Sequence, residues 1–300
     1  MSISHFIKDI GRGKQGARAL DRAQAADLFG QVLDDTVTDL EIGAFCLAMR
    51  IKGETPEEMA GFLDATHQRL QRVPAGAQPL VVLPSYNGAR RLPLLTPLLA
   101  LLCARRGLPV LIHGASTEST RVFVADVLRA LDIAPMQTVV SVADGAVAYA
   151  PTELLCAGLK RLLDVRRVVG VRNSAHSVVK LMNPGAGKAV IVGSYTHPEY
   201  AVSMADTFCL MGATAMLLRG TEGEPVADAR RMPRMEGFVA GQRLPLEEGR
   251  PGTVTDMPDL PREIDAATAA GYIRDVLQGR KPVPDAIGAQ VEHILRLAAA

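Results

Sequence analysis

The stretch with the clearest chemical character lies between residues 80 and 97. An apolar run at 80–83 ends in Pro84, and Ser-Tyr-Asn-Gly-Ala-Arg-Arg follows over 85–91. Thr96 suits a helix N-cap and Pro97 the first helical position. A turn between a buried strand and a helix N-terminus can hold an anion through free backbone N–H groups and the helix dipole. The alternative is a connection without a ligand, because Asn-Gly is a common turn dipeptide.

A second stretch, residues 159–172, is strongly basic. It contains one acid, Asp164, and five cations: Lys160, Arg161, Arg166, Arg167 and Arg172. On a helix, Lys160 and Arg167 share a face with Asp164 between them, and leucines define the other side. The pattern predicts an amphipathic helix or helix pair with a cationic face. A solvated surface helix is the alternative.

Smaller motifs are less specific. The loop at 11–14 places Arg12 and Lys14 beside two glycines. It could hold a phosphate, but a helix C-cap with solvated cations is the preferred interpretation. His176 and His197 have no carboxylate or cysteine partner at metal spacing, so hydrogen-bonding roles are expected. Two acids at 222 and 224 could be remnants of a metal site, although a solvated loop pair is preferred. No Walker motif or nucleophile elbow is present.

Composition limits the classes of function. The 300 residues have a net charge of +1, so any nucleic-acid role must rest on a local basic patch. Aromatic residues make up 4% and tryptophan is absent, which argues against base-stacking platforms. The four cysteines form no Cys-x-x-Cys pair and indicate a reduced, cytoplasmic protein. No signal region and no run of about 18 apolar residues is found, so no membrane association is expected.

The order of elements predicts an α/β protein with a small all-helical N-terminal domain, residues 1–73, and a larger α/β domain, residues 74–300. Capping boxes open helices after residues 21, 38 and 55. Short apolar runs then alternate with helices, which predicts a parallel or mixed sheet covered on both faces. Expected strands are 80–83, 109–113, 138–142, 146–150, 189–192 and 213–219, with a hairpin around 238–244. The helix carrying Ile42, Phe45, Cys46 and Met49 is predicted to form a homodimer interface.

Residues 39–55 resemble the N-terminal helical signature of anthranilate phosphoribosyltransferase and its glycosyltransferase-family-3 relatives, and the resemblance covers most of the chain. His113-Gly114 falls where that family has a Lys-His-Gly-Asn-Arg phosphate loop. Residues 169–173, followed by Asn183-Pro184, resemble its Leu-Gly-Ile-Arg-Thr … Asn-Pro segment. The resemblance implies a helical domain beside an α/β domain, a phosphoribosyl pocket in the cleft, and a homodimer.

The chain departs from the enzymes at their reactive motifs. Their Gly-Thr-Gly-Gly-Asp diphosphate loop is replaced by residues 85–89, where Tyr86 and Asn87 would crowd a cradle. Lys, Asn and Arg are lost from the second phosphate loop. Glu224-Pro225-Val226 stands where the magnesium-binding Asp-Glu pair is expected, and Pro and Val cannot ligate Mg²⁺ through their side chains. Arg172 survives in the place of the anthranilate-binding Arg. Catalytic residues and a metal site are therefore not predicted.

Three motifs are closer to the non-enzymatic, YbiB-type branch of the family: residues 10–14, 84–90 and 170–176. That resemblance implies a protein that binds single- or double-stranded nucleic acid with little sequence preference. The alternative is a transferase acting on a phosphorylated ribose compound, and only that alternative needs Mg²⁺. The expected nucleic-acid surface is Arg12, Lys14, Lys160, Arg161, Arg166, Arg167 and Arg172. A residual phosphate pocket is expected at Ser85, Asn87, Gly88, Arg90, His113, Gly114, Ser116 and Thr120.

Overall fold

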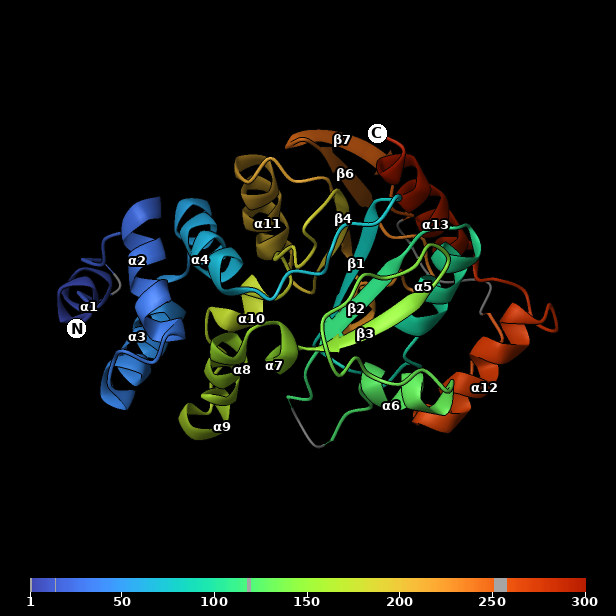
Figure 1. The fold of residues 1–300 in the computed structure, drawn as a ribbon, viewed down its shortest axis with the longest axis horizontal. Coiled ribbons are helices and arrows are strands. Elements are labelled where there is room, and N and C mark those ends of the chain that lie inside the picture. The colour runs from blue at the N-terminus through green and yellow to red at the C-terminus, as the bar shows by residue number, and fades with distance from the viewer. Residues whose placement is uncertain (1, 14, 118–119, 251–257) are drawn as a thin grey trace. The chain divides into compact units, whose positions relative to one another are not determined.

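The computed structural model describes residues 2–13, 15–117, 120–250 and 258–300, which form two compact units (Figure 1). The first unit contains the residues up to Gln71 together with Thr152–Pro184, and the second contains Arg72–Pro151 and Gly185–Ala300. The predicted division at residue 73 places Thr152–Pro184 with the sheet. In the structure this segment packs with the helices instead.

The helical unit is built from two separate segments. The first gives α1 (Ser4–Ile10), α2 (Arg22–Leu33), α3 (Asp39–Lys52) and α4 (Pro56–Arg69), and the second gives α7 (Thr152–Leu155), α8 (Ala157–Asp164), α9 (Arg166–Val169) and α10 (Ala175–Val178). All three capping boxes are formed, since the side chains of Asp21, Thr38 and Thr55 each accept the N–H three residues on. The rings of Phe29, Phe45 and Phe62 meet in the core.

A close approach of backbones joins α8 to α2. A Cβ atom on Gly158 would lie 2.1 Å from the carbonyl oxygen of Leu33, so only glycine fits there. One turn further along α8, Arg161 donates from Nη2 to the carbonyl oxygens of Val32 and Leu33, both at 3.1 Å. These contacts satisfy carbonyls that the end of α2 leaves free. They explain why the segment that follows the third strand belongs to the helical unit.

The second unit is organised around a seven-stranded mixed sheet in the order β3-β2-β1-β4-β5-β6-β7. Strands β1 to β5 are parallel, and β6 and β7 form an antiparallel hairpin at one edge. The predicted hairpin is therefore confirmed, but the segment Thr138–Val142 is not a strand. The bounds are β1 Leu80–Ser85, β2 Val110–Gly114, β3 Val147–Pro151, β4 Ala189–Tyr195, β5 Ala215–Arg219, β6 Met235–Val239 and β7 Gln242–Glu247.

Helices cover both faces of this sheet, as its apolar strands require. Helices α5 (Thr96–Arg105) and α13 (Asp285–Ala298) pack on one face with α6 (Val124–Ala130) and α12 (Ala266–Leu277) beyond them, and α11 (Pro198–Leu210) packs on the other (Figure 1). The parallel register pairs Ser85 with Gly114 and Tyr195 with Arg219. Residues that follow the parallel strands therefore gather at the C-terminal end of the sheet. No helix in the described ranges is long and apolar enough to cross a membrane.

Candidate functional site

The turn after β1 surrounds a buried carboxylate that comes from the loop after β5. Glu224 is 1% exposed. Its Oε1 accepts the backbone N–H groups of Asn87 and Gly88, each at 2.8 Å. Its Oε2 accepts the hydroxyl of Thr96 at 3.2 Å and the hydroxyl of Ser85. Four donors, from the last residue of β1, the turn and the first residue of α5, therefore converge on one side chain.

Glu222 fills the next part of the same turn. Its Oε2 accepts three consecutive backbone N–H groups, from Arg90 at 2.9 Å, Arg91 at 3.1 Å and Leu92 at 3.2 Å. The Asn87 amide donates back to the carbonyl oxygen of Glu222 at 2.8 Å. Successive N–H groups of this kind form a concave site for an anion. Both anion-binding parts of the turn are thus occupied by carboxylates of the same chain.

The loop that carries the two glutamates is held in an unusual conformation. Glu222 has φ 52°, a backbone angle that residues other than glycine rarely adopt. Gly223 has φ +85°, and a Cβ atom there would lie 1.9 Å from the side-chain nitrogen Nδ2 of Asn87. The Ser194 hydroxyl donates to the carbonyl oxygen of Gly223 at 2.7 Å. Among the described residues, the space left between the turn and the loop is too small for a water molecule.

These contacts correct three predictions. Glu224 is not in a solvated loop but is buried in the turn. Thr96 is the first residue of α5 and not its N-cap, because its hydroxyl donates to Glu224 instead of accepting a backbone N–H. Tyr86 does not crowd the turn: its ring is buried and its hydroxyl lies 2.8 Å from Nδ1 of His113.

The residues of the predicted phosphate pocket fall into three groups. Ser85, Asn87, Gly88 and Arg90 hold the two glutamates through a side chain or backbone N–H. His113 and Gly114 are buried at the end of β2, where Tyr149 donates to the Gly114 carbonyl oxygen at 3.3 Å. Ser116 and Thr120 are exposed in the following loop, on either side of two residues outside the described ranges. Only the first group converges on an anion.

His113 is a neutral imidazole at physiological pH. It is fully buried, and this burial lowers its pKa to about 3. Its Nδ1 faces the Tyr86 hydroxyl, while its Nε2 is buried without a hydrogen-bond partner in the described part of the chain. A neutral, buried imidazole adds no positive charge for a phosphate.

Magnesium, which the fold family implies, does not fit the acids at this turn. The carboxylates of Glu222 and Glu224 face N–H and hydroxyl donors, whose protons take the positions that a cation would need. Elsewhere in the described ranges, no group of three or more His, Cys, Asp or Glu side chains is arranged to hold a metal ion.

The basic segment forms α8 and α9 of the helical unit. Lys160 pairs with Asp164, and Nε of Arg167 lies 3.6 Å from the same carboxylate, so the predicted shared face is formed. Arg161 is turned toward the end of α2, where Nε also lies 3.4 Å from Asp35. It therefore serves the packing of α8, whereas the Arg167 side chain is 64% exposed.

Three cations of this unit act on the pKa of a buried histidine. The pKa of His176 is lowered to about 3, chiefly by burial and then by Arg172, Arg166 and Lys180. Arg166 and Arg172 were predicted as part of the basic surface. Lys180, which is 9% exposed, was missed because it follows a run of apolar residues. The spacing of four residues between His176 and Lys180, about one helical turn, could have indicated that the two side chains lie together.

The predicted loop at 11–14 does not join this cluster. Arg12 contacts its own helix, through the Lys8 carbonyl oxygen at 3.2 Å and Asp9 at 3.4 Å. Helix α1 packs on α3, while α8 packs on α2 (Figure 1). Lys14 lies outside the described residues.

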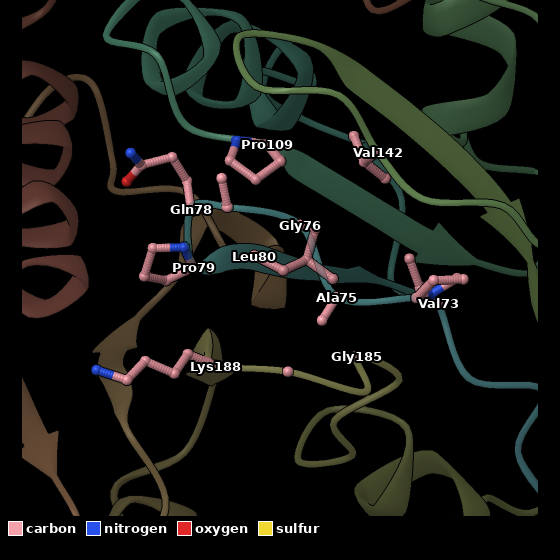
Figure 2. Close-up of a pocket in the computed structure, with 13 residues that line it drawn as sticks. Val73, Ala75, Gly76, Gln78, Pro79, Leu80, Pro109, Val142, Gly185 and Lys188 are labelled. Carbon is pink, nitrogen blue, oxygen red and sulfur yellow. The ribbon is translucent and has the colours of Figure 1, made fainter.

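A cavity of about 200 Å³ opens at the N-terminal end of the parallel strands, beside the first residues of β1, β2 and β4 (Figure 2). Within the described residues, Lys188 is the only charged one in its lining, which is otherwise mostly small and apolar. The cavity shares no residue with the turn that holds Glu224 and Glu222.

Comparisons with known proteins agree with this architecture. A family model described as glycosyl transferase family, helical bundle domain, matches residues 4–69. YbiB of Escherichia coli is 37% identical over 298 residues, which cover 97% of this chain and 92% of YbiB. Anthranilate phosphoribosyltransferase of Nocardia farcinica is 27% identical over 271 residues, 87% of this chain and 77% of the relative. The crystal structure of anthranilate phosphoribosyltransferase (TrpD) from Thermus thermophilus matches with a TM-score of 0.74 at 20% identity, covering 97% of this chain and 87% of that one.

A helical unit together with a mixed α/β sheet defines a protein with the anthranilate phosphoribosyltransferase fold, as the sequence predicted. The similarity to YbiB spans nearly the whole of both chains. The chain belongs to the anthranilate phosphoribosyltransferase-like family of which YbiB is a member.

Proposed function

We propose that the protein binds nucleic acid without sequence preference, through the cationic surface of α8 and α9. The observation that carries the proposal is the charge of this surface. Lys160, Arg161, Arg166 and Arg167 lie within eight residues whose one acid is Asp164, and Asp35 at the end of α2 lies beside Arg161. Because Lys160 and Arg167 share that carboxylate, positive charge remains in excess.

The end of this segment is open to solvent. Arg167 is exposed, and the next residue, Val168, is 89% exposed. Lys and Arg that meet phosphate carry no base information, so slight sequence preference is expected. The sequence resemblance to the YbiB-type branch supports the same function.

The alternative, transfer from a phosphorylated ribose compound, is favoured by the similarity to anthranilate phosphoribosyltransferases but not by the turn after β1. A diphosphate would need the backbone N–H groups of the turn after β1, and Asn87, Gly88 and Arg90–Leu92 already donate to Glu224 and Glu222. The carboxylates of Glu222 and Glu224 also face hydrogen-bond donors, which leaves no position for a metal ion between them. Nucleic-acid binding needs none of these groups.

The experiment is a salt titration of single-stranded DNA binding. Each phosphate contact contributes a slope of roughly −0.7 in log K against log salt. We expect the variant Arg166→Ala/Arg167→Ala, which keeps Arg161 and its contact with α2, to bind more weakly and with a flatter slope. Arg129→Ala is the matched control, since Arg129 is exposed and pairs with Asp126 at the same i, i+3 spacing as Arg167 with Asp164. A folded double variant with the parent's affinity and slope would exclude this surface.

We also propose a homodimer formed through the outer face of α3. The residues predicted for the interface, Ile42, Phe45, Cys46 and Met49, are buried inside the unit, so that prediction named the wrong face. The opposite face exposes Leu40, Leu47 and Ile51, at 84%, 49% and 59%. An apolar stripe of this kind on a charged helix is typical of an interaction surface. A two-fold dimer would present the cationic surface twice.

A further inference from the structure

We propose that the turn after β1 is an oxyanion-binding site held closed by the carboxylate of Glu224, and that a small carboxylate or phosphate ion enters it when that side chain is removed. This goes beyond nucleic-acid binding, which involves other residues in the other unit. The argument rests on the donors around Glu224, on the loop that delivers it, and on the space that is left.

The donors are of the kind that binds oxyanions. Two are backbone N–H groups, of Asn87 and Gly88, which can only donate. Two are hydroxyls, of Ser85 and Thr96, and Thr96 begins the ten-residue helix α5. A helix N-terminus with free N–H groups beside it favours negative charge. Without Glu224, these buried donors would lack an acceptor.

The occupant is supplied by a loop distant in sequence. Glu224 is 136 residues from Gly88 and directly follows a single turn of 3-10 helix, Thr221–Gly223. The loop reaches the turn through Glu222 and Gly223, both in left-handed backbone conformations. Such conformations persist where surrounding contacts determine them. The contacts here are the hydrogen bonds to the turn and the one that the Ser194 hydroxyl donates to the Gly223 carbonyl oxygen.

Occupation by Glu224 and occupation by a free ion exclude one another. The turn and the loop leave no room for even a water molecule in the described structure. A phosphate or acetate therefore competes with the side chain. The intact protein should not bind such ions at this turn, and a protein without the Glu224 carboxylate should bind them there.

Glu224→Ala tests this directly, because the atoms removed, a methylene and a carboxylate, correspond to acetate. We expect the thermal midpoint of the variant in chloride to fall by about 5–15 °C, since buried donors lose their acceptor. Acetate, and separately inorganic phosphate, at the same ionic strength should restore part of this loss in a saturable way, as a ligand that binds only the folded state does. The parent protein should have the same midpoint in all three salts.

Val226→Ala is the matched control. Val226 is buried in the same loop, at 1% exposed, and its truncation destabilises the loop while Glu224 stays in place. We expect its midpoint to fall equally in chloride and acetate. If Glu224→Ala does not fold, Glu222→Ala provides the second test, because Glu222 is only half-buried and its oxygen accepts three backbone N–H groups.

The outcomes separate clearly. Recovery by acetate or phosphate in a glutamate variant but not in Val226→Ala supports the proposal. Equal midpoints in chloride, acetate and phosphate for both glutamate variants would show that the glutamates only fasten the loop. Saturable stabilisation of the parent by phosphate, with shifts of the Asn87 and Gly88 amide resonances, would show that the site is open and overturn the proposal.

Discussion

The hydroxyl of Tyr86 lies 2.8 Å from Nδ1 of His113, and the two rings meet edge to face at a centroid distance of 5.5 Å. Tyr86 is 3% exposed and His113 is fully buried. This pair joins the turn after β1 to the end of β2. The hydrogen bond holds the Tyr86 ring in the core, and the backbone N–H groups of the turn donate to Glu222 and Glu224.

Removal of the Tyr86 hydroxyl should therefore destabilise the protein. In Tyr86→Phe the buried Nδ1 of His113 loses its partner, at a cost of about 1–3 kcal/mol in the free energy of unfolding. Urea denaturation followed by circular dichroism measures this. Tyr200→Phe, at a position that is 37% exposed, should change the value by less than about 0.5 kcal/mol. Equal stability of Tyr86→Phe and the parent would contradict the assignment of this hydrogen bond.

Stability should decrease as the pH falls through the range in which free histidine titrates. The pKa of His113 and of His176 is lowered from 6.5 to about 3, chiefly by burial. Below pH 6.5 the unfolded chain therefore binds more protons than the folded one, and stability is lost as the pH decreases. Between pH 7.5 and pH 5.5 we expect a loss of about 1.4 kcal/mol for each histidine.

The measurement is the free energy of unfolding at the two pH values, in the parent, His113→Gln and His176→Gln. Each substitution should remove about half of the loss that the two histidines cause, whatever its effect on stability at pH 7.5. A variant that keeps the full difference would show that its histidine is protonated in the folded state.

Gly223 should be among the least replaceable residues of its loop. An added Cβ would lie 1.9 Å from the side-chain Nδ2 of Asn87, and φ is +85°. Gly223→Ala should cost about 3 kcal/mol or more, because strain and a steric clash add. Gly212 has φ +61° but no atom within 4 Å of a Cβ position, so Gly212→Ala should cost only about 1 kcal/mol. Thermal unfolding of both variants compares them, and equal shifts would argue against the loop conformation described above.

The proposed dimer can be tested on α3. Leu47→Lys and Ile51→Lys place charge on the exposed stripe without disturbing the buried face. We expect light scattering to give twice the chain mass for the parent at micromolar concentration and a shift toward the chain mass for both variants. Val202→Lys, at a position 61% exposed on α11, should leave the parent's mass unchanged. A parent that already has the chain mass would refute the dimer.

The elements of the fold were largely predictable because their signals are local. The capping boxes at Asp21, Thr38 and Thr55 identified three helices, and the apolar runs identified β1, β2, β4 and β5. The role of Glu224 was not predictable from spacing, since its donors lie more than 120 residues away. The position of Thr152–Pro184 depended on Gly158 and Arg161, whose partners at the end of α2 have no signature in the local sequence.

The two-segment construction of the helical unit also sets an order during synthesis. Chains emerge from the ribosome with the N-terminus first, and domains generally fold as units. Helices α1 to α4 are made early, but α8, which supplies Gly158 and Arg161 to the end of α2, follows only after β1, β2 and β3 have been translated. The first unit to begin is thus completed only when the chain has passed Pro184. Until α8 has been made, the surface of α2 that packs against it stays uncovered on the nascent chain.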